Sequence, residues 1–187
     1  MHVSSFAFDI ARLVRHGDNL RPTFTAMANV RFELTHDIAA PPEVVWRELI
    51  DWKGHEAWVV STHVDTTTSA GVPQVGDEFT AWTGPAPASK LGQRVSLEDR
   101  MRVDELDFDD AAKSGSCKVT KLGPVLTGWA AFAVSPHDGG TQIEWTEDVV
   151  VRYAPQLFAP VLARIGIVGF RLSLSRLAKQ LRSAESG

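Results

Sequence analysis

The stretch TQIEWTEDVVVRYAPQLFAPVLARIGIVGFRLSLSRLAKQLRS, residues 141–183, decides the fold of this chain. Its first part largely alternates apolar and polar residues, which is the period of a half-buried strand. From about residue 156 the apolar residues recur at helical spacing, with Pro160 near the start as the only proline. The stretch therefore predicts a last strand that leads directly into one long C-terminal helix over residues 156–183.

The residues before this stretch predict a sheet and little else. A strand opens at residues 29–37, where Val30, Phe32 and Leu34 alternate with polar residues, and the prolines beside Glu43 favour a short helix after it. Further strand-like segments follow, separated by turn residues that favour antiparallel hairpins. They are residues 59–68, 77–83, 94–106, 116–122, 126–134 and 141–151. This order predicts an α+β fold rather than a doubly wound parallel sheet.

The length of 187 residues suits a single domain, because such a chain buries enough surface to build a core without disulfides or metals. We assign that domain to residues 29–183, with a short tail at residues 184–187. Residues 1–28 combine an amphipathic stretch with a segment rich in chain breakers, and we expect an N-terminal appendage there. Two interpretations stay open. Residues 1–26 form a helix docked on the domain, or they result from a gene start assigned too early, since Met27 would serve equally well as the first residue.

Composition and charge exclude several classes of function. With 44% hydrophobic and 22% charged residues the chain is typical of a soluble globular protein, and a net charge of -4 argues against nucleic acid as a partner. Apolar runs fall short of the roughly 18 residues that a membrane helix needs, so we expect no membrane span. A single cysteine, Cys117, precludes an internal disulfide and fits a reducing compartment, from which we predict a cytoplasmic location.

Motifs for metals, phosphates and activated nucleophiles are missing from the sequence. The six histidines show no spacing of the HExxH kind, and there is neither a Gly-rich phosphate loop nor a GxSxG nucleophile elbow. We therefore predict no metal and no cofactor.

Three short phrases occur in the order and spacing of a known family. They are APPEVVW at residues 40–46 leading to Asp51 and Trp52, VGDEF at residues 75–79 and GGTQIEW at residues 139–145. The chain resembles the START-like superfamily, also called SRPBCC or helix-grip proteins, and within it the polyketide cyclase/dehydrase-like group. The resemblance implies a helix-grip fold, a curved seven-stranded antiparallel sheet around the C-terminal helix with short helices after the first strand. It also implies a pocket between sheet and helix for a small hydrophobic ligand.

The middle of the C-terminal helix carries small residues on the face expected to meet the sheet. Gly166, Gly169 and Ser173 lie on this face, with Phe170 beside them. Glycine inside a helix costs on the order of 1 kcal/mol relative to alanine, so two of them need a reason. One reason is a close approach of the helix backbone to the sheet, and the other is a void that holds a ligand.

Two acids fall among apolar residues of predicted strands. Glu147 shares a side with Trp145 and Val149, and Asp99 shares one with Met101. A buried carboxylate must pair with a base or a hydrogen-bond donor, or take a raised pKa, so both acids are candidate catalytic residues. The alternatives for Glu147 are a β-bulge that turns it outward and a place on the rim of the sheet.

Tryptophans are the other candidates for contact with a ligand, because an indole offers a flat apolar surface and one donor. Most of them are expected in the core, and any that faces a void would stack on a flat ligand. The full set of expected ligand-binding residues is Trp58, Trp82, Met101, Trp129, Trp145, Glu147, Gly166, Gly169, Phe170 and Ser173.

Three functions follow as hypotheses. The first is binding, transport or sequestration of a small hydrophobic molecule that is lipid-, aromatic- or polyketide-like. The second is a polyketide cyclase, aromatase or dehydratase in which Glu147 or Asp99 moves a proton. The third is an interaction module, because Val161, Val168 and Leu172 add apolar surface on a further side of the C-terminal helix. The N-terminal segment or a second copy in a homodimer would cover that surface.

Overall fold

The computed structural model describes residues 27–66 and 72–185, so the expected N-terminal appendage lies outside the described residues apart from its last two positions. The chain forms, in order, β1 (Met27–Ile38), α2 (Pro42–Ile50), α3 (His55–Trp58), β2 (Thr62–Thr66), β3 (Glu78–Thr83), α4 (Lys90–Gln93), β4 (Leu97–Asp109), β5 (Ser114–Pro124), β6 (Leu126–His137), β7 (Gly140–Arg152), the 3-10 turn η1 (Gln156–Phe158) and α5 (Ala159–Glu185).

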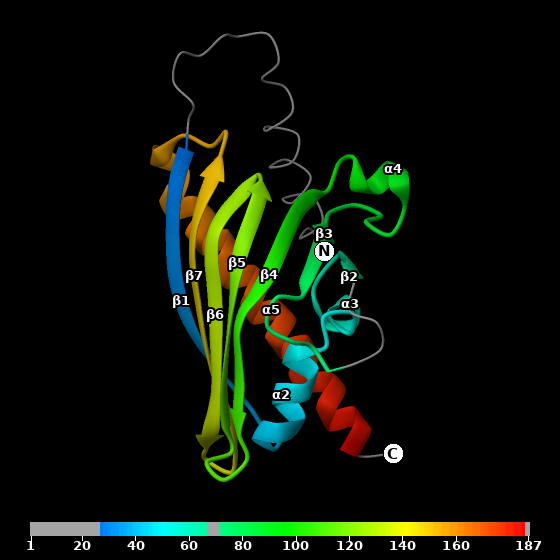
Figure 1. Cartoon of the computed structure of the whole chain (residues 1–187), viewed down its shortest axis with the longest axis vertical. Helices are drawn as coiled ribbons and strands as arrows, with labels where there is room; N and C mark the ends of the chain where they lie inside the picture. The colour runs from blue at the N-terminus through cyan, green and yellow to red at the C-terminus, as the bar shows by residue number, and fades with distance from the viewer. Residues whose placement is uncertain (1–26, 67–71, 186–187) are drawn as a thin grey trace, which may run out of the picture.

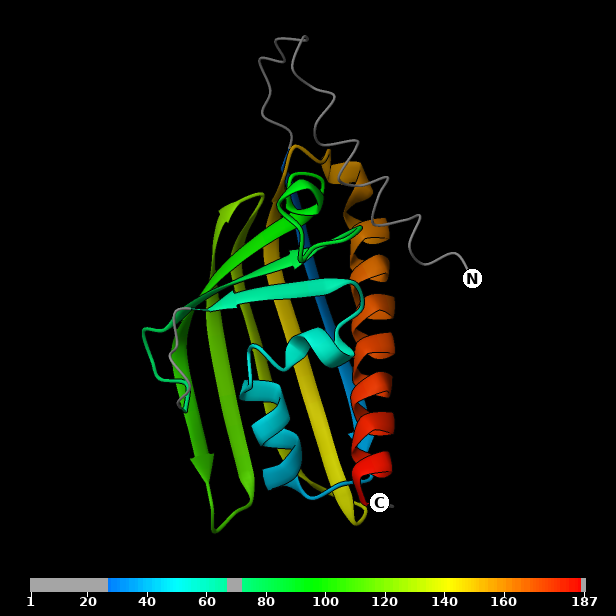
Figure 2. The ribbon, with the colours of Figure 1, turned by 90° about the vertical axis from the view of Figure 1, so that its right-hand side faces the viewer.

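The seven strands form one sheet in the order β1-β7-β6-β5-β4-β3-β2, and every neighbouring pair is antiparallel. Figure 1 views the sheet from its outer face, with α5 passing behind it. Figure 2 shows the same molecule from the side, with the curved sheet on one side, α5 on the other, and α2 and α3 between them at one end. The predicted α+β helix-grip fold is confirmed.

Alternation along the strands builds the core between the sheet and α5. In β1, Val30, Phe32 and Leu34 are buried while the residues between them are exposed, and β7 repeats the pattern from Thr141 to Val151. From α5, Leu174, Leu177, Ala178 and Leu181 face these strands and are buried. Each large aliphatic side chain removed from water contributes roughly 1.5–3 kcal/mol, so this layer fixes the helix on the sheet.

The structure corrects two predicted elements. The strand expected at residues 59–68 begins only at Thr62, because α3 extends to Trp58 and a turn follows it; residues 67 and 68 of this prediction lie outside the described part. The strand expected from residue 94 begins at Leu97, because a short helix, α4, precedes it. Ser89 caps that helix, accepting a hydrogen bond from the backbone N–H of Gly92 at 2.9 Å.

The C-terminal helix has two apolar faces. With η1 it forms one helical segment, Gln156–Ala184, long and apolar enough by length and composition to cross a membrane, which corrects the expectation that no segment would qualify. In the fold it is the core helix, packed on the sheet. The outer apolar row of this segment faces away from the sheet; it consists of Leu157, Phe158, Val161, Val168 and Leu172, which are 40–74% exposed.

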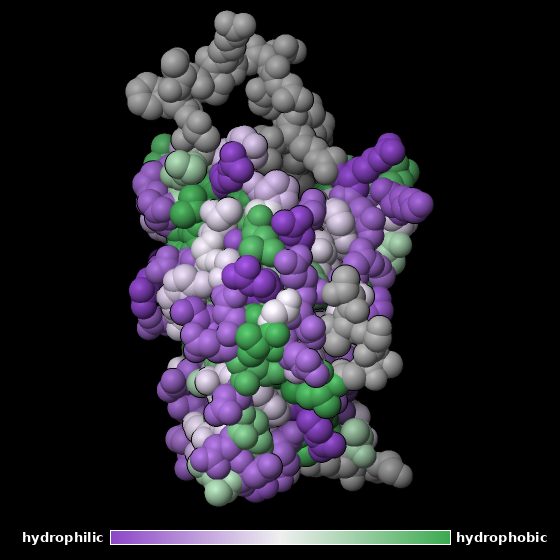
Figure 3. Space-filling view, in the orientation of Figure 1, coloured by the Kyte–Doolittle hydropathy of each residue, from purple (hydrophilic) through white to green (hydrophobic). Residues whose placement is uncertain are grey.

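The outer face of the sheet is mainly hydrophilic. In Figure 3, which has the orientation of Figure 1, hydrophobic residues form separate spots among polar ones. This distribution is the ordinary one for a sheet whose other face carries the core.

Candidate functional site

Three charged side chains meet on the inner face of the sheet, and we call them the inner triad. Lys121 of β5 places its Nζ 2.6 Å from Oδ2 of Asp99 on β4 and 3.4 Å from Oε2 of Glu147 on β7. The Lys121 and Glu147 side chains are only 4% and 6% exposed, and that of Asp99 is 16% exposed. A buried ion cluster in an apolar layer is costly unless its members satisfy one another, so this geometry is the most distinctive chemistry of the inner face.

Small residues on the intervening strand allow the triad to form. Strand β6 lies between β5 and β7, and on it Gly128 pairs with Lys121 while Ala130 pairs with Glu147. Gly128 has a φ of +124°, and a Cβ added to it would lie 2.3 Å from the carbonyl oxygen of Asp148. No larger side chain therefore fits at Gly128, and the lysine crosses β6 unobstructed.

The β-bulge considered for Glu147 is absent, because the pairing of β7 with both neighbours is regular through this residue. Its partner on β1 is Phe32. The indole Nε1 of Trp145 donates to Oε1 of Glu147 at 3.2 Å. Glu147 thus points inward, with one oxygen toward Lys121 and the other toward the indole.

Burial and charge act in opposite directions on the pKa values of the triad. For Glu147, loss of solvation raises the pKa, the Lys121 ammonium lowers it and Asp99 raises it again, and the balance is a raised pKa. For Lys121, burial lowers the pKa, but attraction to Asp99 and Glu147 outweighs burial and the pKa ends above its ordinary value. The ammonium therefore stays charged, and burial favours the protonated form of Glu147.

One oxygen of the triad lacks a partner. Within the described residues, Oδ1 of Asp99 is buried and has no hydrogen-bond donor, although Oδ2 receives the Lys121 ammonium. The indole N–H groups of Trp52 and Trp58 are buried without an acceptor in the same part of the molecule. A buried unpaired polar atom costs about 1–3 kcal/mol, so a donor brought to Asp99 Oδ1 would recover free energy.

An aromatic cluster links the triad to the short helices. Trp52 stacks on Phe79 at 4.4 Å between ring centroids, and His55 lies between Trp52 and Trp58 with centroid distances of 5.5 and 4.6 Å. Phe79 pairs with Met101, whose sulfur lies 3.8 Å from Lys121 Nζ. The predicted residues Trp58 and Met101 therefore belong to one buried layer next to the triad.

The two helix glycines have different surroundings. A Cβ on Gly166 would lie 2.6 Å from Cε1 of Phe32, so this glycine serves the close approach of α5 to β1 and no void lies there. A Cβ on Gly169 would meet no atom within 4 Å. Ser173 is buried and donates its hydroxyl to the carbonyl of Gly169 at 2.9 Å. The close approach of the helix therefore accounts for Gly166, whereas the space beside Gly169 is open and its role as part of a ligand site stays a prediction.

Aromatic rings fill the space beside Gly166. Phe170 lies 5.9 Å from Phe32 and 4.5 Å from Trp145, and Trp145 stacks on Phe132 at 5.3 Å. Trp145 and Phe170 thus take part in the packing between sheet and helix, as their predicted inward positions require.

Two predicted tryptophans lie on the other side of the sheet. Trp82 donates its indole N–H to Asp65, and Trp129 lies under the Lys118 ammonium at 5.4 Å. Both follow the outward positions of their strands, next to the inward Ala81 and Ala130. The expectation that they line an inner pocket is corrected, because alternation places them on the outer face.

Lys121 is the site residue that sequence reasoning missed. Its signal was present, since Cys117, Val119 and Lys121 share one side of β5 and the first two are apolar. A lysine at the end of an inward row needs a carboxylate within reach, and the inward rows of the neighbouring strands offer Asp99 and Glu147.

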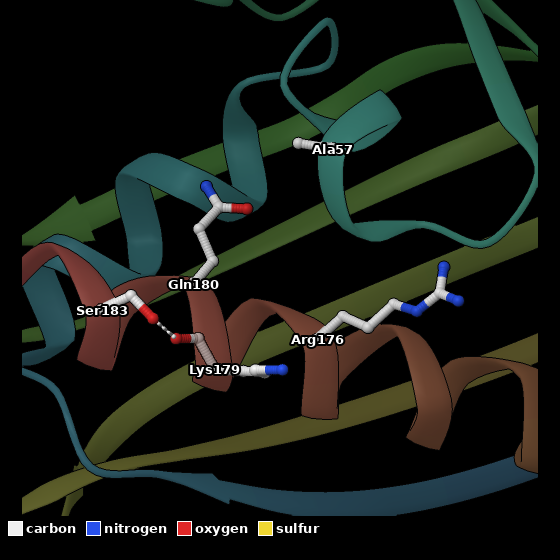
Figure 4. A pocket seen from close by; sticks show the side chains of 5 residues that line it. All are labelled: Ala57, Arg176, Lys179, Gln180 and Ser183. Atoms are coloured by element: carbon white, nitrogen blue, oxygen red, sulfur yellow. Dashed lines mark hydrogen bonds between the residues drawn. The ribbon is translucent and has the colours of Figure 1, made fainter.

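Two surface hollows lie away from the triad. One, of 310 Å³, is lined by Ala57 of α3 and by Arg176, Lys179, Gln180 and Ser183 of α5 (Figure 4). The other, of 190 Å³, lies on the outer face across β4 to β7. The first is lined mainly by polar side chains that reach into solvent, so it does not correspond to the apolar pocket expected between sheet and helix. Among the described residues no group of three or more His, Cys, Asp or Glu could hold a metal ion.

A sheet that wraps one long C-terminal helix defines the helix-grip class of START-like proteins. A family model described as "Polyketide cyclase / dehydrase and lipid transport" matches residues 29–182. The chain belongs to this family, within the SRPBCC superfamily. A comparison with curated proteins finds no match.

Solved structures share the fold at low identity. A START superfamily protein from Mycobacterium smegmatis has a TM-score of 0.58 and 13% identity, covering 82% of this chain and 98% of its own. A protein from Nitrosomonas europaea has a TM-score of 0.56 and 16% identity, covering 84% of this chain and 97% of its own. A protein from Thermobifida fusca has a TM-score of 0.55 and 21% identity, covering 80% of this chain and 91% of its own. At these identities the likeness concerns the fold alone.

Proposed function

We propose that this protein binds a small, mainly apolar molecule that carries a hydrogen-bond donor, on the inner face of the sheet beside Asp99. The observation that supports it most is the buried, unpaired Oδ1 of Asp99 within an otherwise satisfied triad. Membership of a family described by polyketide cyclases and lipid transport agrees with a hydrophobic ligand. The protein's cytoplasmic location stays a prediction from its single cysteine.

The charges around Asp99 explain why the ligand should carry a hydrogen-bond donor. Lys121 already occupies Oδ2, so the remaining oxygen accepts a hydroxyl or N–H group and repels a ligand carboxylate or carbonyl. The half-buried Ala81 and Leu97 lie on the same side of neighbouring strands, and Gly169 faces open space on α5. A phenol or an alcohol with an apolar body matches this arrangement better than a fatty acid.

Calorimetric titration with 2-naphthol and 2-methylnaphthalene tests the proposal, because the two probes share a shape and differ in the donor. The full chain should bind 2-naphthol about tenfold more tightly, the value of one hydrogen bond to a charged acceptor. Asp99→Asn keeps an oxygen for Lys121 but replaces the charged acceptor by a neutral amide, so the preference for 2-naphthol should become smaller. Asp107→Asn, on an exposed position of the same strand, is the matched control. Equal binding of both probes, or binding of neither, refutes the proposal.

A second function is favoured by one further observation, the raised pKa of Glu147 beside the Lys121 ammonium. A raised pKa makes a carboxyl group better suited to exchange a proton with a ligand oxygen, as cyclisation and dehydration of a polyketide chain require. In that case Glu147→Gln should abolish turnover of an enolisable β-keto thioester and leave 2-naphthol binding intact. Unchanged turnover would remove Glu147 from the chemistry.

A further inference from the structure

The outer apolar row extends from Leu157 in η1 to Leu172, through the first half of α5. Val161, Val168 and Leu172 follow a spacing of seven and four residues, which places them on one line, and Leu157 precedes Val161 by one turn. Only 17% of the most apolar 18-residue window of the segment is buried. In Figure 2 no described element lies beyond α5 on the side away from the sheet.

Such a row is unusual on a surface. Single exposed apolar residues are ordinary, whereas aligned ones mark an interaction site. The inner face of the same helix is already committed to the core through Leu174 and Leu177, which are fully buried. The exposed part of the outer row is therefore not used by the core of the described domain and is available for contact with a partner.

The charge of the helical segment indicates which partner covers the outer row. Between Gln156 and Ala184 the helical segment contains five basic residues and no acidic one, although the whole chain has a net charge of -4. The basic residues are Arg164, Arg171, Arg176, Lys179 and Arg182. Arg164 and Arg171 are exposed and flank the row on one side, and no salt bridge of the described residues involves either.

We propose that this face of α5 docks on the surface of an anionic lipid bilayer. The apolar row would enter the boundary between headgroups and acyl chains, while the arginine side chains reach the lipid phosphates. The helix lies along the membrane and does not cross it, because its other face remains packed on the sheet. This inference does not depend on the ligand proposed above.

Other occupants fit the charges less well. A second copy placed helix against helix would bring two all-basic flanks together, with no carboxylate between Gln156 and Ala184 to compensate. Residues 1–26 contain three arginines and two aspartates, so they also offer no excess of negative charge. An anionic membrane supplies both the apolar layer and the negative charge.

Co-sedimentation of the full chain with vesicles tests the proposal. Vesicles of phosphatidylcholine with phosphatidylglycerol should bind the protein, and vesicles of phosphatidylcholine alone should bind it far less. Arg164→Gln and Arg171→Gln should each weaken binding about fivefold, which corresponds to the contribution of one basic residue near an anionic surface. Added salt should weaken the binding of the unmodified protein more than that of the double Arg variant.

The double variant V161E and V168E measures the apolar contribution to vesicle binding separately from the contribution of the arginines. Both positions are exposed and helical, and glutamate is a better helix former than valine, so the fold is retained. Vesicle binding should be lost, whereas V72E with V75E, two exposed valines before β3, should bind like the unmodified chain. Absence of binding to the anionic vesicles, or binding that V161E with V168E leaves unchanged, overturns the proposal. So does a dimer in sedimentation equilibrium that the same variant dissociates.

Discussion

Lys121 and Glu147 are in contact although a complete strand separates them. Their strands, β5 and β7, both pair with β6, and the 3.4 Å approach of Lys121 Nζ to Glu147 Oε2 passes over Gly128 and Ala130. The lysine is thereby shared between two carboxylates from strands on both sides. Because Lys121 serves both acids, the stability of this layer depends on Lys121 more than on either acid alone.

Replacing Lys121 with methionine should destabilise the fold by about 3–5 kcal/mol at neutral pH, since the buried Glu147 and the half-buried Asp99 then lose the one cation that pairs with them among the described residues. Urea unfolding measures the change. Lys118→Met on the same strand is the control; its ammonium lies over the outer-face Trp129, and its loss should cost about 1 kcal/mol or less. Equal effects of the two substitutions would contradict the assigned role of Lys121.

Glu147 gives a stability that depends on pH. Because the pKa of Glu147 is raised above about 4.5, the folded state binds the proton more tightly than the unfolded state. Its favourable contribution is complete below that pH and is lost as the pH rises through the raised pKa. Glu147→Gln should remove this decline, so that unfolding free energies of variant and unmodified protein diverge toward neutral pH in favour of the variant. Glu144→Gln, on the exposed side of β7, is the control substitution.

His55 has the opposite pH dependence. Burial lowers the pKa of His55 to about 4, and its Nε2 lies 2.8 Å from the carbonyl oxygen of Leu49. The unfolded state then binds a proton more readily between about 6.5 and 4, so stability is present above pH 6.5 and is lost as the pH falls toward 4. His55→Gln, which retains a donor for Leu49, should unfold at a lower pH in acid titrations followed by circular dichroism. An unaltered acid midpoint would argue against a neutral, half-buried His55, and the exposed His137 provides the control substitution.

The fold was predictable because its signals are local. Alternation in residues 141–151 and helical spacing in residues 156–183 each reflect one element that buries one face, and the structure repeats both. The short helix α4 was not predicted, because it lies in a segment rich in proline and glycine. It depends on a cap in which Ser89 accepts a hydrogen bond from the backbone of Gly92.

The site was predictable only in part, since it depends on which strands are neighbours. The inward position of Glu147 follows from its own strand, but its contact with Lys121 requires the order of β5, β6 and β7 and a glycine on the middle strand. Alternation would have predicted the outward positions of Trp82 and Trp129 if the inner face of each strand had been assigned first.

The two glycines of α5 provide the sharpest comparison of packing. Gly166→Ala forces a methyl group to within 2.6 Å of the Phe32 ring, which cannot withdraw without disturbing Phe170, so about 1–3 kcal/mol of stability should be lost. In Gly169→Ala the new methyl group meets no atom within 4 Å apart from the adjoining backbone of its own helix, and the entropic penalty of glycine is removed, so the substitution should stabilise the helix by up to about 1 kcal/mol. Thermal unfolding of the two variants should move in opposite directions. If the open space beside Gly169 receives the ligand, Gly169→Leu should also weaken 2-naphthol binding without loss of stability; a variant that is stable and binds normally would place the ligand elsewhere on the inner face.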